Sequence, residues 1–197
     1  MAEPNLVLEP NLRAEPRSVL APELEAAWLA EPVLERVAWI LTSHQAAFGR
    51  PLIPAAANRR LAAQELFVAP VVVLAHDDPG QTGEAAGGAS AAGHSEVDPI
   101  GPRLIYANVA ALRLWRRPWA TMVGLPSWLT AEPVARAERA RALRQALRDE
   151  AIAHYSGVRI DSHGRRFQLR GARLWTLRDA AGQSRGQAAC FSDWYWL

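Results

Sequence analysis

The amino-acid sequence predicts an α+β protein with five strands, several helices and a hydrophobic core of its own. Half of the 197 residues are apolar and about a fifth are charged, as in chains that fold into a packed domain. Residues 71–75 form an uninterrupted, mostly β-branched run of strand length, and residues 130–153 repeat their apolar positions at helical spacing. Turn signals separate the alternating segments of the C-terminal part, which predicts a meander of strands there.

The N-terminal part divides into a tail and a helical extension. Residues 1–22 contain four prolines, which block helix formation and strand pairing, so we expect a disordered or extended tail. Residues 23–69 are expected to form an N-terminal helical extension, with a helix over about 23–50 that breaks near Pro32 and a second helix over 58–67. Residues 70–197 then form the core of the domain.

The core is expected to begin with the strand 71–75, which lacks polar positions and is therefore covered on both faces. Residues 78–102 are dominated by Gly, Ala, Ser and acidic side chains, which bury too little apolar surface to fold, so this stretch is expected to be a flexible insertion. The next strand, 104–106, changes abruptly into a helix, and Asn108 stands at the join. A short helix over 118–123 is expected to follow.

A longer helix is predicted from an N-cap at Thr130 to about Ala153, where His154 ends it. Its expected inner stripe consists of Ala140, Leu143, Leu147 and Ala151. Three strands complete the chain, at 158–160, 166–177 and 186–194, and Gly171 is expected to form a bulge in the middle one.

Several segments, in this order, resemble the MEKHLA domain family, whose fold is PAS-like. They are VLAHD at 73–77, YANVAALRLW at 106–115, LPSWLTAEP at 125–133, YSGVRI at 155–160, GRRF at 164–167 and GQAACFSDW at 186–194. The resemblance spans about residues 25–197 and suits a stand-alone bacterial protein of this family. It implies a five-stranded antiparallel sheet with helices on one face, preceded here by the N-terminal helices.

The resemblance also implies a sensory or interaction module, with light, oxygen, redox state or a small ligand as inputs. It supplies no ligand, cofactor or catalytic residue. The family usually joins the strand that carries His76 to the following strand by a short turn, whereas here the insertion at 78–102 intervenes.

The charge is unevenly distributed along the chain. All 22 basic residues are Arg; residues 1–102 carry 6 Arg against 13 acidic residues, and residues 103–197 carry 16 against 7. A basic half is compatible with nucleic-acid binding, or with an acidic N-terminal part that lies over the basic part within one molecule or across a dimer. No nucleic-acid recognition motif is present, so we expect no specific nucleic-acid partner.

The sequence gives little support for catalysis, a metal site or membrane insertion. Without lysine there is no phosphate-binding or Schiff-base lysine, and no nucleophile elbow or metal-binding His pair is found. Cys190, the only cysteine, is expected to be a small buried side chain. No run of about 18 apolar residues occurs, so a cytoplasmic protein is expected. An enzyme is the remote hypothesis.

Aromatic and polar residues around the strand-to-helix join are the candidates for ligand binding. Asn108 is either an N-cap or a group that recognises a ligand, and both roles are compatible. The aromatic group beside it either walls a pocket or forms plain core. The complete set of candidates is Tyr106, Asn108, Trp115, Trp119, Met122, Trp128, Leu143, Phe167 and Trp175.

His76 is either half of an acid-base pair with Asp77 or a strand-ending side chain bonded to backbone. Two functional hypotheses remain. In one, the domain binds a small apolar or aromatic ligand and signals through its N-terminal helix or a dimer interface. In the other, it binds no ligand and forms a homodimer or captures a partner protein.

Overall fold

The computed structural model describes residues 27–78 and 101–197. The predicted tail at 1–22 and nearly all of the predicted insertion at 78–102 lie outside these ranges. The expected contact between the acidic and basic halves falls largely on residues outside them too. The division of the chain into tail, extension and core therefore stays a prediction.

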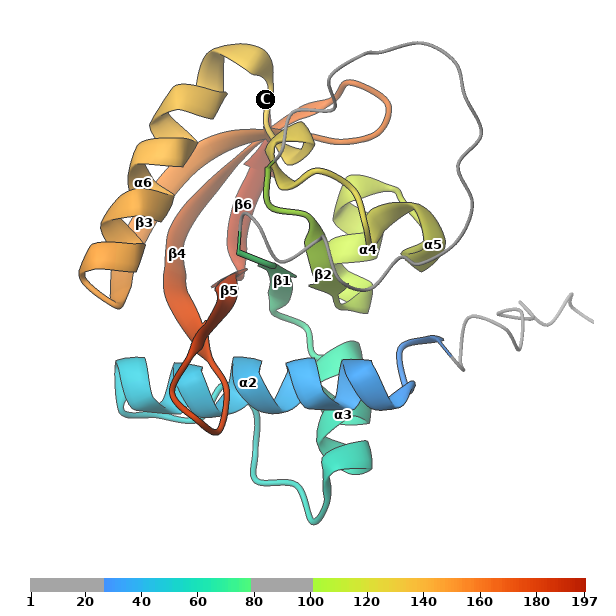
Figure 1. Cartoon of the computed structure of the whole chain (residues 1–197). Coiled ribbons are helices and arrows are strands. Elements are labelled where there is room, and N and C mark those ends of the chain that lie inside the picture. Colours follow the sequence, from blue (N-terminus) through green and yellow to red (C-terminus); the bar gives the residue numbers. More distant parts are fainter. Residues whose placement is uncertain (1–26, 79–100) are drawn as a thin grey trace, which may run out of the picture.

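The described chain forms one antiparallel sheet between two layers of helices (Figure 1). In chain order the elements are α2 (Glu31–Phe48), α3 (Arg59–Val68), β1 (Val72–His76), β2 (Leu104–Ala107), α4 (Val109–Trp115), α5 (Trp119–Met122), the 3-10 helices η2 (Ser127–Thr130) and η3 (Pro133–Ala135), α6 (Arg136–Arg148), β3 (Ala151–Ile160), β4 (Arg166–Arg178), β5 (Ser184–Phe191) and β6 (Asp193–Trp196). The expected fold class is confirmed. None of the described helices is long and apolar enough to span a bilayer.

The strands are ordered β2-β1-β5-β4-β3, and β6 pairs with the first half of β4. The single strand expected at 186–194 is thus two strands, because the chain leaves the β5 ladder after Phe191 and pairs again from Asp193. All five residues of β1 are buried, as the unbroken apolar run predicted.

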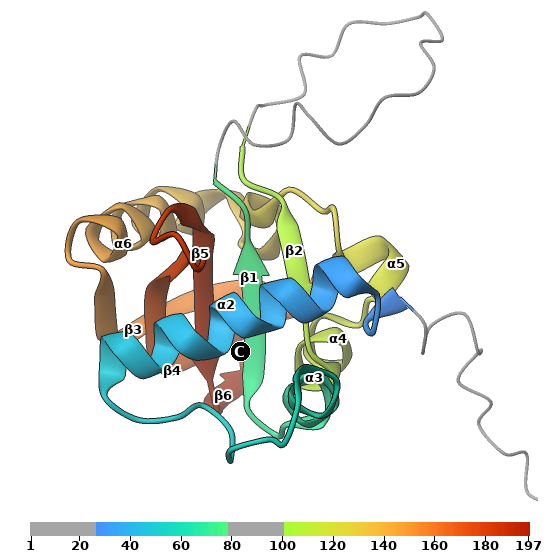
Figure 2. The ribbon, with the colours of Figure 1, turned by 60° about the horizontal axis from the view of Figure 1, so that its bottom comes forward.

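The N-terminal helices α2 and α3 cover one face of the sheet. Figure 2 shows α2 lying across the strands, on the side opposite α4 and α6. Val37 and Ile40 of α2 pack in one cluster with Val73 and Trp175 from the sheet. The expected break near Pro32 is observed: Ala27 is helical, residues 28–30 form a turn and a bend, and α2 begins at Glu31. Pro32 lies in the first turn of α2, where proline suits a position whose N–H has no partner within the helix.

The opposite face, called the inner face here, is covered by α4, α5 and α6. Trp115 of α4 and Met122 of α5 form a second cluster with Val72, Phe167 and Phe191 of the sheet, and Ala142 and Ala146 of α6 form a third with Leu174. Successive residues of a strand point to opposite faces, so β1 contributes alternately to the first and second clusters.

The long helix differs from its prediction at both ends. It begins at Arg136, because Thr130 belongs to η2 and its hydroxyl donates to the carbonyl of Ser127. It ends at Arg148, and Ala151 already pairs with Trp175 in the sheet. The buried residues of the helix are Ala142 and Ala146, whereas Leu147 of the predicted stripe is 48% exposed. His154 lies within β3 with a positive φ of 63° and not at a helix end.

Candidate functional site

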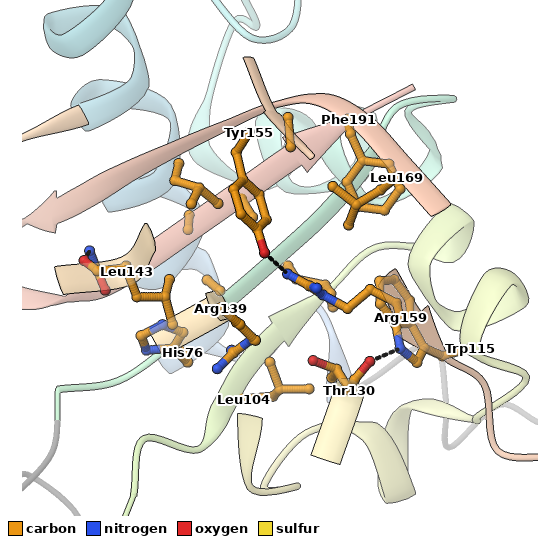
Figure 3. Close-up of a pocket in the computed structure, with 17 residues that line it drawn as sticks. His76, Leu104, Trp115, Thr130, Arg139, Leu143, Tyr155, Arg159, Leu169 and Phe191 are labelled. Carbon is orange, nitrogen blue, oxygen red and sulfur yellow. Dashed lines mark hydrogen bonds between the residues drawn. The ribbon is translucent and has the colours of Figure 1, made fainter. Parts of the chain in front are cut away.

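A small cavity lies between the inner face of the sheet and the helices α4 and α6 (Figure 3). Its volume is about 50 Å³, which is room for a few water molecules at roughly 10–15 Å³ each. Each of the strands β1 to β5 contributes to its wall, and Thr130 at the end of η2 closes one side. A partly enclosed site between a sheet and helices can hold a small molecule.

Most of the wall is apolar. Strand alternation directs Leu74 of β1 and Leu174 of β4 inward, while their neighbours Val73 and Trp175 face α2. The indole of Trp115 lies at the helical side, where its Nε1–H donates to the carbonyl of Thr130 at 3.4 Å. This hydrogen bond fixes the orientation of the ring and leaves its face for apolar contact.

His76 brings an imidazole to the cavity from the end of β1. Its Nδ1 is 2.8 Å from the carbonyl oxygen of Asp77, which accepts, so Nδ1 carries the proton of the neutral ring. Burial lowers the pKa of His76 to about 4, and the nearby charge of Arg139 acts in the same direction. The buried Nε2 has no hydrogen-bond partner among the described residues. Of the two interpretations of His76, the bond to backbone is the one observed.

Two arginines and a tyrosine complete the polar part of the wall. Arg159 of β3 is only 6% exposed, and its guanidinium donates to the Tyr155 hydroxyl at 3.1 Å and to the Val158 carbonyl at 2.8 Å. Arg139 reaches the cavity from α6. Burial and, to a smaller extent, the charge of Arg159 lower the pKa of Arg139 to about 9. The cavity thus combines an apolar wall with convergent cationic groups.

Asn108 lies outside this cavity and is fully buried. Its Oδ1 accepts from Ala111 N–H at 3.1 Å, which is the predicted N-cap, and also from Val73 N–H at 3.0 Å. Its Nδ2 donates to the carbonyls of Val71 at 2.7 Å and Ala69 at 3.1 Å. One amide therefore ties the start of α4 to the start of β1 and the end of α3.

The nine candidate ligand-binding residues do not form one site. Trp115 and Leu143 line the cavity. Met122 and Phe167 lie in the apolar cluster beside it. Trp128 is partly exposed, with the guanidinium of Arg136 4.2 Å above its ring.

The other three candidates, Tyr106, Trp119 and Trp175, pack in the cluster on the α2 side of the sheet. There Tyr106 meets Trp119 edge to face, and Trp175 meets His44 of α2 in the same way, with ring centroids 5.8 Å and 5.0 Å apart. Contact of any of the nine with a ligand stays a prediction.

The polar residues of the cavity were not among these candidates, although the sequence contains signals for two of them. Arg159 interrupts an apolar strand between Val158 and Ile160, and a charge in such a run indicates a special position. Arg139 precedes Ala142 and Leu143 by three and four residues and so shares their helical face. The stripe predicted for this helix, Ala140, Leu143, Leu147 and Ala151, had a different phase and did not include Arg139.

No cysteine is among the residues that line the cavity. Within residues 27–78 and 101–197, no three His, Cys, Asp or Glu side chains gather as a metal site would require. Cys190 is buried on the α2 side of the sheet, where burial raises the pKa of its thiol.

The fold is similar to that of solved PAS and light-oxygen-voltage domains. An RNA-binding light-oxygen-voltage receptor superimposes with a TM-score of 0.50 and 19% identity, over 72% of this chain and 34% of the receptor chain. The PAS domain of a protein from Colwellia psychrerythraea gives a TM-score of 0.49 and 10% identity, over 65% of this chain and 89% of that domain. At these identities the likeness concerns the fold alone.

No curated protein matches the sequence significantly. The MEKHLA domain family matches residues 34–196, which is most of the chain and includes α2, the whole sheet and the cavity. The chain therefore belongs to the MEKHLA domain family and has its PAS-like fold.

Proposed function

We propose that this domain is a sensory module that binds a small molecule in the cavity between the sheet and α6, and that binding changes the packing of α2. The observation that supports binding is the cavity itself, because it is partly enclosed, mostly apolar and supplied with a few convergent polar groups. Its volume of about 50 Å³ restricts the ligand to a few non-hydrogen atoms, unless α6 moves away from the sheet.

The sheet provides the connection to α2. Leu174 lines the cavity, and the next residue, Trp175, packs under α2 against His44 and Phe48. In β1, likewise, Leu74 lies on the cavity side and Val73 on the α2 side. A ligand that shifts these strands must therefore also change the surface on which α2 lies. Coupling of this kind requires that the ligand bind one arrangement of α2 more tightly than another.

The test of binding is native mass spectrometry and thermal denaturation of the purified chain with a panel of small neutral and charged molecules. Leu143→Trp places an indole into the cavity from α6 and should abolish binding. Leu147→Trp is the matched control, because this residue lies one turn later on the same helix and is 48% exposed. If the wild type binds nothing in the panel, or if Leu143→Trp binds as the wild type does, the proposal is wrong.

The test of signalling is hydrogen exchange. Ligand should change the protection of amides in α2, across the sheet from the cavity. Equal protection of α2 with and without bound ligand would contradict a relay through the sheet.

A second candidate function is self-association through β6. This strand pairs only with β4 among the described residues, so its other edge is a template for a second copy, and Tyr195 on it is 46% exposed. Tyr195→Lys should then lower the mass measured by light scattering, whereas Val134→Lys, at another exposed apolar position, should not. A wild-type monomer would exclude this function.

A further inference from the structure

The cavity has an excess of positive charge. Arg139 enters it from α6, Arg159 enters it from β3, and the imidazole of His76 lies beside them (Figure 3). None of the residues that line the cavity is Asp or Glu. The wall therefore presents two guanidinium groups and offers them no carboxylate.

Six other arginines of the described residues form ion pairs with acidic side chains. The ion pairs are Arg59–Glu31, Arg116–Asp161, Arg166–Glu132, Arg170–Asp193, Arg178–Glu150 and Arg185–Asp179. The side chains of these six arginines are 32–57% exposed, so water solvates their charges and a partner contributes little. In the cavity, Arg159 is buried and Arg139 is partly buried, so a partner matters more for these two arginines.

The contacts of the two arginines do not replace a carboxylate. Arg159 donates to a carbonyl and to the neutral Tyr155 hydroxyl. Arg139 has no hydrogen bond or ion pair within residues 27–78 and 101–197. Burial and the neighbouring Arg159 together lower the pKa of Arg139 to about 9, because both make the charged form of its guanidinium less favourable. Buried charges in proteins are normally paired, because an unpaired one loses its hydration without compensation.

We propose that the cavity binds a small organic monocarboxylate, with its carboxylate between Arg139 and Arg159 and its apolar part against Leu74, Leu174 and Trp115. This inference rests on the proposed function and names the chemical class of its ligand. The planar fork of a guanidinium matches a carboxylate and donates two parallel hydrogen bonds to it. The largely apolar wall favours an anion that carries hydrocarbon over a fully hydrated inorganic ion.

The probe is butyrate, which combines a carboxylate with a short apolar chain. Its control is butyramide, which has nearly the same shape without the charge, and inorganic phosphate tests for a site that accepts any anion. We expect isothermal titration calorimetry to show binding of butyrate, with butyramide and phosphate at least about tenfold weaker, since a charged hydrogen bond contributes roughly a factor of 10 to 100. Equal affinity for butyramide or for phosphate would overturn the assignment of a monocarboxylate.

Variants on α6 test the role of the arginines. Arg139→Gln should weaken butyrate at least about tenfold, Arg139→Lys should retain part of the affinity, and Arg141→Gln, on the exposed side of the same helix, should bind as the wild type does. If Arg139→Gln binds butyrate with wild-type affinity, Arg139 does not hold the carboxylate and the inference is wrong.

A measurement without ligand gives an independent test. Arg139→Met removes an unpaired charge from an apolar wall while keeping the length of the side chain, so the ligand-free variant should melt at a higher temperature than the wild type. Butyrate should no longer raise that temperature. A variant that melts lower than the wild type would contradict the absence of a partner for Arg139.

The outcomes separate this inference from the proposed function. If neutral molecules bind in the cavity, are blocked by Leu143→Trp and are insensitive to Arg139→Gln, the sensory proposal stands and the anionic ligand class is wrong. If neither butyrate nor any neutral molecule binds, both are wrong.

Discussion

Two asparagines that cap helices provide the sharpest test of how this fold is held together. Asn58 accepts a hydrogen bond from Leu61 N–H at 2.8 Å at the start of α3, and Asn108 accepts one from Ala111 N–H at 3.1 Å at the start of α4. Asn58 is exposed, whereas Asn108 is fully buried, also accepts from Val73 N–H, and directs its two Nδ2–H groups to the carbonyls of Leu66, Ala69 and Val71. Alanine at each position therefore removes the same cap in two different environments.

The expected costs follow from the number of hydrogen bonds. An N-cap contributes about 1 kcal/mol, so Asn58→Ala should lower the free energy of unfolding by about that amount. Asn108→Ala loses the cap and three more bonds at about 1 kcal/mol each, so we expect a loss of about 4 kcal/mol. Such a loss is a large part of the roughly 5–15 kcal/mol by which domains of this size are stable.

Urea denaturation followed by tryptophan fluorescence measures both variants. With a slope of about 2 kcal/mol per M urea, the midpoint should fall by about 0.5 M for Asn58→Ala and by about 2 M for Asn108→Ala. Asn108→Asp keeps both accepted bonds but has no N–H to donate, and its carboxylate would face backbone carbonyls, so it should also be strongly destabilised. Equal midpoints for the two alanine variants would refute the idea that the tertiary bonds of Asn108 stabilise the fold.

Three further predictions concern pH, backbone and thiol chemistry. Burial lowers the pKa of His44 and of His76 from 6.5 to about 4, so between pH 6.5 and pH 4 the unfolded chain takes up protons that the folded protein does not. The free energy of unfolding should therefore fall on acidification by up to about 3 kcal/mol per histidine. Urea titrations at several pH values should show a smaller dependence on pH for His76→Gln than for the wild type. Gly186 has a φ of 124°, and a Cβ added there would lie 1.9 Å from the carbonyl oxygen of His76. Gly186→Ala should therefore lower the melting temperature far more than Gly182→Ala, where an added Cβ meets open space. Equal shifts in melting temperature would contradict the close approach of Gly186 to His76. Cys190 is 1% exposed and burial raises the pKa of its thiol, so a thiol reagent should label it only after denaturation; rapid labelling of the folded chain would show that this face of the sheet opens.

Local sequence signals predicted the elements whose stability is mostly local. The strand at 71–75, the helix after Asn58 and the helix after Asn108 each follow from a short run of residues, and each is confirmed. The reason is that an N-cap bond or a continuous apolar run acts within a few residues and does not depend on partners far along the chain.

The region from Thr130 to His154 shows where local signals fail. The observed helix begins after Ala135 without a side-chain cap, and the chain turns out of it at Glu150, which adopts a φ of 63° without being glycine. Glu150 pairs with Arg178 of β4, and Ala151 pairs with Trp175, so partners distant in sequence end the helix and begin β3. An Ala-rich sequence with helical propensity is overridden there by the sheet.

The fold class and most of the strands follow from the amino-acid sequence, because periodicity, caps and turn residues act at short range, and the family follows from the resemblance of several motifs. Which aromatic residues share a cluster, and which side chains meet in the cavity, depends on the tertiary packing. A register irregularity between Ala75 and His76 places Tyr106 toward α2 and Leu104 toward the cavity, and no local pattern reveals it. Arg139 and Arg159 stand 20 residues apart in the sequence and on different elements, so only the packing of α6 against the sheet brings their charges together.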